Sequence, residues 1–383
     1  MYFMSSLLKL SIVSLIISLS PLDLFAANQE RVTFFLLRGI GRESGHWGNT
    51  FTNYVKNQIP SAQFVLMDLP GAGRYYNKPA LSTIEKMADF LRTEHLTLMD
   101  SLEGKKVIVA TSLAGNVALE WVMQYPGDFQ GAILLSTSLK RICKGKERVQ
   151  PEAKKQFVNI FLTDDIKERE KEFLSINSNL NVGNDSLLNA WENIQKLRPV
   201  AKGALLKQTV AGMVYKPRRA EPTIPVLLIG SKTDKIVAET CFRKVAKALN
   251  GDLYLHEHAG HGIPVDVPQW LADTTSYWTL NNVLSYYPPD SISTDVTTRD
   301  KDNGLFPVKW LDNGVSSVGQ VSTQAYKGTE QVFTDSWQWM DDSISWIGKF
   351  TRILHVKDKQ QKNQFKALRK TIRQQKKSRK KSG

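Results

Sequence analysis

Residues 107–121 read VIVATSLAGNVALEW. A short β-branched run passes directly into a helix-like pattern, and a lone serine, Ser112, stands at the corner between them. Small residues lie two positions away on each side, at Ala110 and Ala114, and Gly115 follows. This is a variant of the G-x-S-x-G nucleophile elbow, a strained strand-to-helix turn that needs small neighbours. Because alanine replaces the first glycine, the pattern alone leaves open a serine that simply caps a helix.

Continuous apolar runs recur on both sides of this corner. Such runs are typical of strands buried on both faces of a parallel sheet, and helix-like segments lie between them. The sequence therefore predicts an α/β fold with a mainly parallel sheet and helices on both faces. The expected strands are Val32–Leu37, Phe64–Met67, Val107–Ala110, Ala132–Leu135, Val226–Ile229 and Leu253–Leu255. The expected helices are one that starts in a capping box of Ser82 and Glu85 and runs toward Met99, then Leu113–Gln124 and Thr240–Leu249.

Residues 140–221 interrupt this alternation. The segment is long, charged and helix-rich, and it separates the fourth expected strand from the fifth. We expect a helical cap inserted over the carboxyl ends of the strands, where open α/β sheets bind ligands. Trp191, Leu197 and Pro199 are expected to pack this cap, with a place for Trp191 in the substrate pocket as the alternative.

Two residues further along the chain could activate the serine. A serine hydroxyl is a poor nucleophile unless a base takes its proton and a carboxylate orients that base. Asp234 follows one expected strand, and His261 follows the next, 27 positions later. The order Ser112, Asp234, His261 is the chain order of α/β-hydrolases. We therefore predict Ser112 as nucleophile, His261 as base and Asp234 as the acid that orients it.

The loop after the first expected strand should complete an oxyanion hole. The backbone N–H groups of Ile40 and Leu113 are the candidate donors. Gly39 and Gly41 would allow the backbone to approach the substrate closely.

Charged and aromatic side chains crowd the same loop, namely Arg38, Arg42, Glu43, His46 and Trp47. These side chains could bind an anionic substrate group, but we favour a structural ion pair beside a packed aromatic ring.

Two other histidines and a glycine-rich turn complete the candidates. His256 and His258 are expected to support His261 or to face solvent. The turn Asp68–Arg74, DLPGAGR, resembles a phosphate loop but does not open a helix at dinucleotide spacing. We interpret it as a structural turn.

Residues 31–272 resemble the α/β-hydrolase superfamily, and most closely uncharacterised proteobacterial α/β-fold serine hydrolases. LLRG followed by RESGHWG, DLPGAGR, the elbow, WENIQKLRPV and AGHGIPVDVPQW carry the resemblance. It implies a cap after the sixth strand of the usual count and the same three catalytic residues. Arg38-Gly39 departs from the His-Gly of many members. Ser112 argues against the dehalogenase branch, whose nucleophile is aspartate.

Charge is unevenly distributed. The chain has a formal net charge of +14, but twelve Lys or Arg and one acid follow residue 356, so the other 356 residues carry about +3. The body of the chain is therefore not a basic nucleic-acid binder. We divide the chain into a signal peptide (1–26), a hydrolase domain (27–280), a linker (281–330) and an amphipathic helix with a basic tail (331–383).

The tail leaves three alternatives open. It could bind an anionic membrane surface, dock on the domain or dimerise, or bind nucleic acid through phosphate charge alone, without base-specific recognition. The oligomeric state stays open.

Cys143 and Cys241 lack metal or redox spacing, and the sequence does not decide whether they pair. No cofactor or metal is expected.

Together these features predict an exported, periplasmic or secreted serine hydrolase that cleaves a carboxylic ester through an acyl-enzyme. An acyltransferase on the same triad, and a non-catalytic envelope or membrane-surface binding protein, are the alternatives.

Overall fold

The computed structural model describes residues 30–218 and 221–284. The predicted signal peptide, nearly all of the predicted linker and the predicted amphipathic helix and tail lie outside these residues. The descriptions below concern the described part of the chain.

A six-stranded sheet forms the centre of the fold, with the strand order β2-β1-β3-β4-β5-β6. All five neighbouring pairs are parallel, as the continuous apolar runs predicted. The strands are β1 (Val32–Leu37), β2 (Ala62–Met67), β3 (Lys105–Thr111), β4 (Gly131–Leu135), β5 (Val226–Ser231) and β6 (Asp252–His256). Each expected strand is present. Several are longer than their apolar run, because backbone pairing continues where the side chains become polar.

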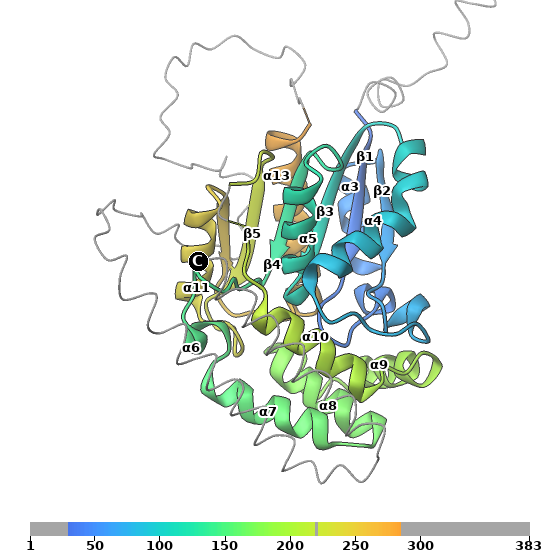
Figure 1. The fold of residues 1–383 in the computed structure, drawn as a ribbon, viewed down its shortest axis with the longest axis vertical. Helices are drawn as coiled ribbons and strands as arrows, with labels where there is room; N and C mark the ends of the chain where they lie inside the picture. Colours follow the sequence, from blue (N-terminus) through green and yellow to red (C-terminus); the bar gives the residue numbers. More distant parts are fainter. Residues whose placement is uncertain (1–29, 219–220, 285–383) are drawn as a thin grey trace, which may run out of the picture.

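Helices cover both faces of the sheet (Figure 1). One face packs against α4 (Ile84–Ser101), α5 (Leu113–Gln124) and α11 (Glu239–Ala248), and the other against α3 (Thr50–Gln58) and α13 (Pro268–Asn282). Successive residues of β1 alternate between the two cores: Phe35 and Leu37 belong to one, and Phe34 and Leu36 to the other. Each such side chain contributes about 1.5–3 kcal/mol by its burial.

The helix starts differ in detail from the prediction. The helix α5 has the predicted bounds, whereas α11 begins one residue earlier than expected. The predicted cap of α4 was wrong: Thr83, not Ser82, is the N-cap, and its hydroxyl accepts a hydrogen bond from the Lys86 N–H at 3.3 Å. A hydroxyl residue at either position fits the pattern, and only backbone geometry decides which one caps.

Five helices between β4 and β5 form the predicted cap. They are α6 (Gly145–Arg148), α7 (Pro151–Leu162), α8 (Ile166–Asn177), α9 (Asp185–Leu197) and α10 (Lys202–Val214). Figure 1 shows α7 to α10 across the carboxyl ends of the strands. Trp191 is buried as expected, but Leu197 is 72% exposed and Pro199 is also exposed, so their predicted packing was wrong. Both follow the last buried turn of α9, where the chain faces solvent.

A disulfide bond joins the entrance of the cap to α11. It links Cys143 to Cys241, which are separated by 98 positions in sequence. Beside it, the Ala238 N–H donates to the Glu147 carbonyl at 2.8 Å, and the Gln150 N–H donates to the Ile236 carbonyl at 2.9 Å. The start of the cap is therefore fixed to the loop after β5.

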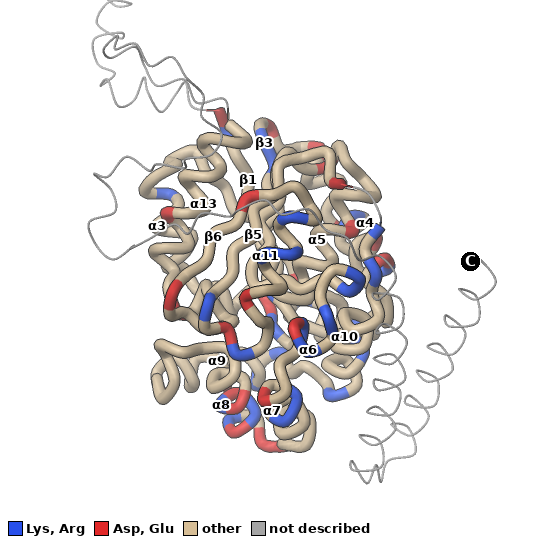
Figure 2. Tube along the Cα trace, turned by 90° about the vertical axis from the view of Figure 1, so that its left-hand side faces the viewer, with Lys and Arg blue, Asp and Glu red and all other residues tan. Residues whose placement is uncertain are grey.

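Charges of both signs are interspersed over the described part of the chain, and α7 and α8 each carry both (Figure 2). Among the described helices, none combines the length and the apolar character that crossing a bilayer would require.

Candidate active site

Ser112 occupies a sharp turn between β3 and α5. Its backbone has φ 57° and ψ −117°, a strained conformation for a residue with a side chain. Its N–H donates to the Leu135 carbonyl at 2.7 Å, which fixes the turn to the neighbouring strand. Gly115 is required by close packing, because a Cβ there would lie 1.9 Å from Oγ1 of Thr137. These features are those of a nucleophile elbow.

Ser112 lies at one end of a hydrogen-bonded row of three side chains. The Nε2 atom of His261 is 2.8 Å from Oγ of Ser112, and the Nδ1 atom is 2.8 Å from Oδ2 of Asp234. The other carboxylate oxygen of Asp234 accepts from the N–H groups of Ile236, at 2.7 Å, and Val237, at 2.9 Å. His261 and Asp234 are buried, while Ser112 is partly exposed. The structure thus brings together three residues from separate loops at the carboxyl edge of the sheet.

The loop that carries His261 is held from two sides. From the sheet, the Ser136 hydroxyl donates to the His261 carbonyl at 2.7 Å. From the cap, the Asn177 carbonyl at the end of α8 accepts from the Gly262 N–H at 2.6 Å. The carboxylate of Asp266, in α12 (Ile263–Asp266), accepts from the N–H groups of Gly260 and Asn179.

The two candidate oxyanion donors flank the serine. Among the described residues, no acceptor is found for the N–H of Ile40 or of Leu113. The loop of Ile40 lies tightly against the elbow, since a Cβ on Gly39 would be 2.9 Å from the Thr111 carbonyl and 3.2 Å from Cβ of Ser112. Gly39 therefore permits the loop to pack closely against the elbow. The close approach of Gly39 and Gly41 to a substrate stays a prediction.

Two charged pairs fix this loop to the cap, as the structural interpretation expected. Arg42 binds the carboxylate of Glu170 in α8 with both terminal nitrogens, and both side chains are buried. Glu43 accepts from Arg198, just after α9, through Nε at 2.9 Å and through Nη2. These contacts give Arg42 and Glu43 a structural role.

His46, in a short turn Ser44–Trp47, completes the buried charged cluster. Its Nε2 lies 3.0 Å from Nη1 of Arg42, which donates to it. Burial, and then the positive charges of Arg42, Arg38 and Arg198, hold the pKa of His46 well below its usual value. His46 is therefore a neutral acceptor inside the protein.

Arg38 differs from these neighbours. It is 4% exposed, and its guanidinium lies over the Trp47 ring, 5.2 Å from the centroid. Its Nε and Nη1 are buried and have no hydrogen-bond partner in the described chain. Burial, and then the charge of Arg42, lower the pKa of Arg38 to about 9. The structural interpretation does not account for this cation.

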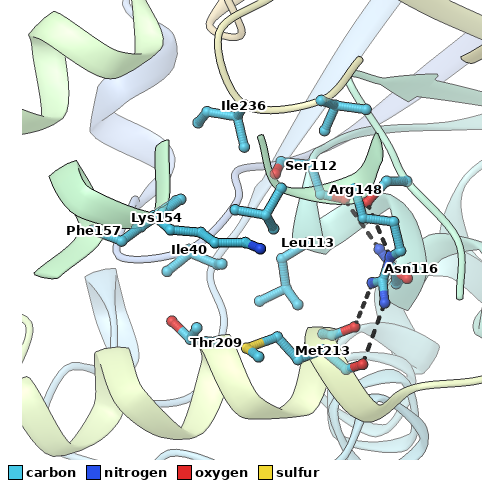
Figure 3. A pocket seen from close by; sticks show the side chains of 14 residues that line it. Ile40, Ser112, Leu113, Asn116, Arg148, Lys154, Phe157, Thr209, Met213 and Ile236 are labelled. Atoms are coloured by element: carbon cyan, nitrogen blue, oxygen red, sulfur yellow. Dashed lines mark hydrogen bonds between the residues drawn. The ribbon is translucent and has the colours of Figure 1, made fainter. Parts of the chain in front are cut away.

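A cavity of about 240 Å³ opens on Ser112 (Figure 3). Apolar side chains from the loop after β1, the elbow, the cap and the loop after β5 line most of it: Ile40, Leu113, Val149, Phe157, Met213, Ile236 and Val237. Arg148 lies at one wall, where it donates to the carbonyls of Gly212 and Met213. Figure 3 shows the amino group of Lys154 directed toward the cavity. Trp191 is not among the lining residues, so its alternative place in the pocket was wrong.

The remaining candidates have structural contacts. Nδ1 of His256 accepts from the N–H groups of His258 and Ala259, and His258 is exposed. The carboxylate of Asp68 accepts from the N–H groups of Ser44, at 2.6 Å, and Arg74, at 2.9 Å. The glycine-rich turn is therefore a structural turn, as interpreted.

Sequence reasoning missed the side chains that join the loops of the candidate site to the cap. Gln208 of α10 accepts from the Gly41 N–H, Glu170 binds Arg42, and Asp266 joins the His261 loop to the end of α8. No local pattern marks these residues, because each acts through a partner distant in sequence.

The sequence of this chain matches the model of a known protein family. The model of the Alpha/beta hydrolase family matches residues 34–274, which is most of the described chain. The chain belongs to the alpha/beta hydrolase family. The match includes the elbow, the whole cap and both loops that carry Asp234 and His261.

Solved structures of known proteins share this fold. An esterase from Thermogutta terrifontis aligns with a TM-score of 0.51 at 18% identity, over 66% of this chain and 91% of its own. A hydrolase from Oleispira antarctica aligns with a TM-score of 0.53 at 14% identity, over 66% of this chain and 92% of its own. The esterase EaEST from Exiguobacterium antarcticum aligns with a TM-score of 0.51 at 16% identity, over 65% of this chain and 92% of its own. At these identities the likeness concerns the fold alone. No curated protein sequence matches the chain significantly.

Proposed function

We propose that this alpha/beta hydrolase cleaves carboxylic esters with Ser112 as the nucleophile. The observation that carries the proposal is the hydrogen-bonded row from Ser112 through His261 to Asp234, which ends at a largely apolar cavity. Serine needs such a base to attack an ester, and the base needs a carboxylate to fix its tautomer.

Acylation comes first. Oγ of Ser112 attacks the ester carbonyl while Nε2 of His261 takes its proton, and Asp234 stabilises the imidazolium. The N–H groups of Ile40 and Leu113 stabilise the negative oxygen of the tetrahedral intermediate. His261 then gives the proton to the leaving alcohol, and the C–O bond breaks.

Deacylation repeats the steps with water. His261 removes a proton from water, the hydroxide attacks the acyl-serine carbonyl, and the proton returns to Oγ of Ser112 as the carboxylic acid leaves. Each lost oxyanion donor should lower turnover by about 100–1,000-fold.

The cavity supports an acyl group of moderate size. Its volume is about 240 Å³, and its walls are mostly aliphatic or aromatic. Lys154 is exposed, with its amino group directed toward the cavity, and its alkyl stem can cover apolar substrate atoms. We therefore place the acyl chain in this cavity.

The Cys143–Cys241 bond supports export to an oxidising compartment, because such bonds persist mainly outside the cytosol. Binding of anionic membrane surfaces by residues 331–383 stays a separate proposal. Co-sedimentation with anionic vesicles tests it: the full chain should bind, and a chain lacking residues 330–383 should not. Equal binding by both would contradict it.

A fluorophosphonate probe and an ester panel test the proposed reaction. The wild-type protein should be labelled at Ser112 and should hydrolyse esters of graded acyl length, whereas Ser112→Ala should do neither. Asp234→Asn, which keeps the shape of the side chain, should lower kcat by about 10,000-fold. Absence of labelling and of hydrolysis in a folded wild-type protein would refute the proposal. With competing alcohols, ester products in place of acid would assign the triad to acyl transfer.

A further inference from the structure

A second, smaller cavity lies beside the catalytic residues. Its volume is about 40 Å³, enough for a small polar group, since one water needs about 10–15 Å³. Ile40, Ser112, Phe157 and Ile236 line both this cavity and the larger one. The two cavities therefore meet at the serine, where an ester would have one half in each.

The small cavity holds polar groups without partners. Arg38 and Thr111 line it, and within residues 30–218 and 221–284 no partner is found for Nε or Nη1 of Arg38 or for Oγ1 of Thr111. A buried cation without a partner is destabilising, so its presence calls for a ligand or a function.

The nearby acids do not neutralise Arg38. The carboxylate of Glu170 binds Arg42, that of Glu43 binds Arg198, and that of Asp234 binds His261. The charge that shifts the pKa of Arg38 comes from another cation, Arg42. An anion that entered the small cavity would therefore find positive charge that the protein has not compensated.

The orientation of the bound ester follows from the position of His261. In the proposed reaction, Nε2 of His261 must give its proton to the alcohol oxygen, so the alcohol half leaves on the His261 side. His261 lines the small cavity and not the large one. The acyl half then occupies the large apolar cavity, and the alcohol half lies near Arg38.

We propose that Arg38 and Thr111 form a subsite for a carboxylate carried by the alcohol half of the ester. The guanidinium would donate charge-assisted hydrogen bonds to the carboxylate, and the Thr111 hydroxyl would donate another. The substrate class is thus an acyl ester of a short hydroxy acid. This inference rests on the proposed ester hydrolysis and adds its leaving-group specificity.

Matched esters test the subsite. Butyryl esters of glycolate and of 3-hydroxypropanoate are compared with the butyryl esters of the corresponding neutral hydroxyamides, with released butyrate as the readout. The wild type should prefer the carboxylate at one of the two spacer lengths by roughly 10–100-fold in kcat/KM. Arg38→Gln should abolish this preference, measured as the ratio of kcat/KM on the charged ester to kcat/KM on the neutral ester, and Arg38→Lys should keep part of it.

Arg31→Gln is the matched control. Arg31 immediately precedes the same strand, β1, at its other end, is exposed and pairs with Glu103 on the surface. This variant loses the same charge and should leave the preference unchanged.

A binding measurement adds a second readout. The hydroxy acid of the preferred spacer length, glycolate or 3-hydroxypropanoate, should raise the melting temperature of wild type and of Ser112→Ala, but not of Arg38→Gln, and the corresponding hydroxyamide should raise none of them.

The outcomes separate the two proposals. A wild type that is labelled by fluorophosphonate and cleaves neutral esters without any charge preference would overturn the subsite alone. Equal losses of kcat/KM on charged and neutral esters in Arg38→Gln would give Arg38 a structural role, and this result would also overturn the subsite. Failure of labelling and of all hydrolysis would overturn the proposed function, and with it the leaving-group specificity.

Discussion

The side-chain oxygen of Gln208 accepts a hydrogen bond of 2.9 Å from the backbone N–H of Gly41. Gln208 belongs to the cap helix α10, and Gly41 follows Ile40, whose N–H is a proposed oxyanion donor. The amide of Gln195 in α9 also donates to the Gly41 carbonyl, at 3.5 Å. The cap therefore holds the loop of the proposed oxyanion donor in addition to covering the carboxyl ends of the strands.

Gln208→Leu should lower kcat more than it raises KM. The variant leaves the buried Gly41 N–H without an acceptor and lets the loop shift, which should cost less than losing a donor outright, about tenfold in kcat. Gln156→Leu is the control, because Gln156 donates to Ser175 within the cap and does not contact the loop. Equal effects of the two variants on kcat would contradict this role for Gln208.

Gly115→Ala should destabilise the protein by about 1–3 kcal/mol. The added Cβ would lie 1.9 Å from Oγ1 of Thr137, and this overpacking should outweigh the better helix propensity of alanine. Gly127→Ala is the matched control, since no atom lies within 4 Å of a Cβ there, and it should stay within about 0.5 kcal/mol of wild type. Urea denaturation measures both. A Gly115→Ala protein as stable as the control would refute the predicted clash.

Replacing Cys143 and Cys241 together by alanine should lower the free energy of unfolding by about 2–4 kcal/mol. The bond closes a loop of 98 positions, so in the chain-entropy account it restricts the unfolded chain strongly. Urea denaturation with and without reductant measures the effect. Reductant should destabilise the wild type and leave the double variant unchanged. If the stability of the wild type does not change with reductant, even after a cycle of unfolding and refolding, the result would contradict the presence of the bond.

Acidification should destabilise the fold through His46. Its pKa in the folded protein is well below the unfolded value of about 6.5, so the unfolded chain binds the extra proton first. The stabilising effect is present above pH 6.5 and is lost as the pH falls below it, by up to about 1.4 kcal/mol per pH unit. Burial also lowers the pKa values of His95 and His256, which add to the slope.

His46→Gln tests that contribution. Glutamine can still accept from Arg42 but does not titrate, so the decrease in stability from pH 6.5 to 5 should be smaller than in wild type. Thermal melts across this range give the slope. An unchanged slope would show that His46 binds its proton equally in the folded and the unfolded chain, so that folding does not lower its pKa.

Sequence patterns predicted the sheet, and they also marked Ser112, Asp234 and His261, which the structure brings together, because both depend on local signals. Burial on both faces makes a parallel strand continuously apolar, and the strained turn at Ser112 needs small neighbours that the sequence displays. The choice between Ser82 and Thr83 as helix cap failed, since both carry a suitable hydroxyl.

Contacts between residues far apart in the chain could not be predicted from the sequence. The pairing of Cys143 with Cys241 and the hydrogen bond from Gly41 to Gln208 depend on how the cap sits on the sheet. The same holds for Arg38, whose lack of a partner is visible only once the nearby carboxylates are seen to bind other groups. A charged residue in a loop has the same appearance in sequence whether it is paired or not.

The attachments of α8 bear on how substrate reaches the serine. Glu170 on this helix binds Arg42, and the Asn177 carbonyl at its end accepts from Gly262, next to His261. A hinge movement that lifted α8 would break both contacts and displace the proposed base and the proposed oxyanion loop together. Substrate entry that leaves α8 in place avoids this disruption. We therefore expect α8 to stay attached during turnover of dissolved short-chain esters.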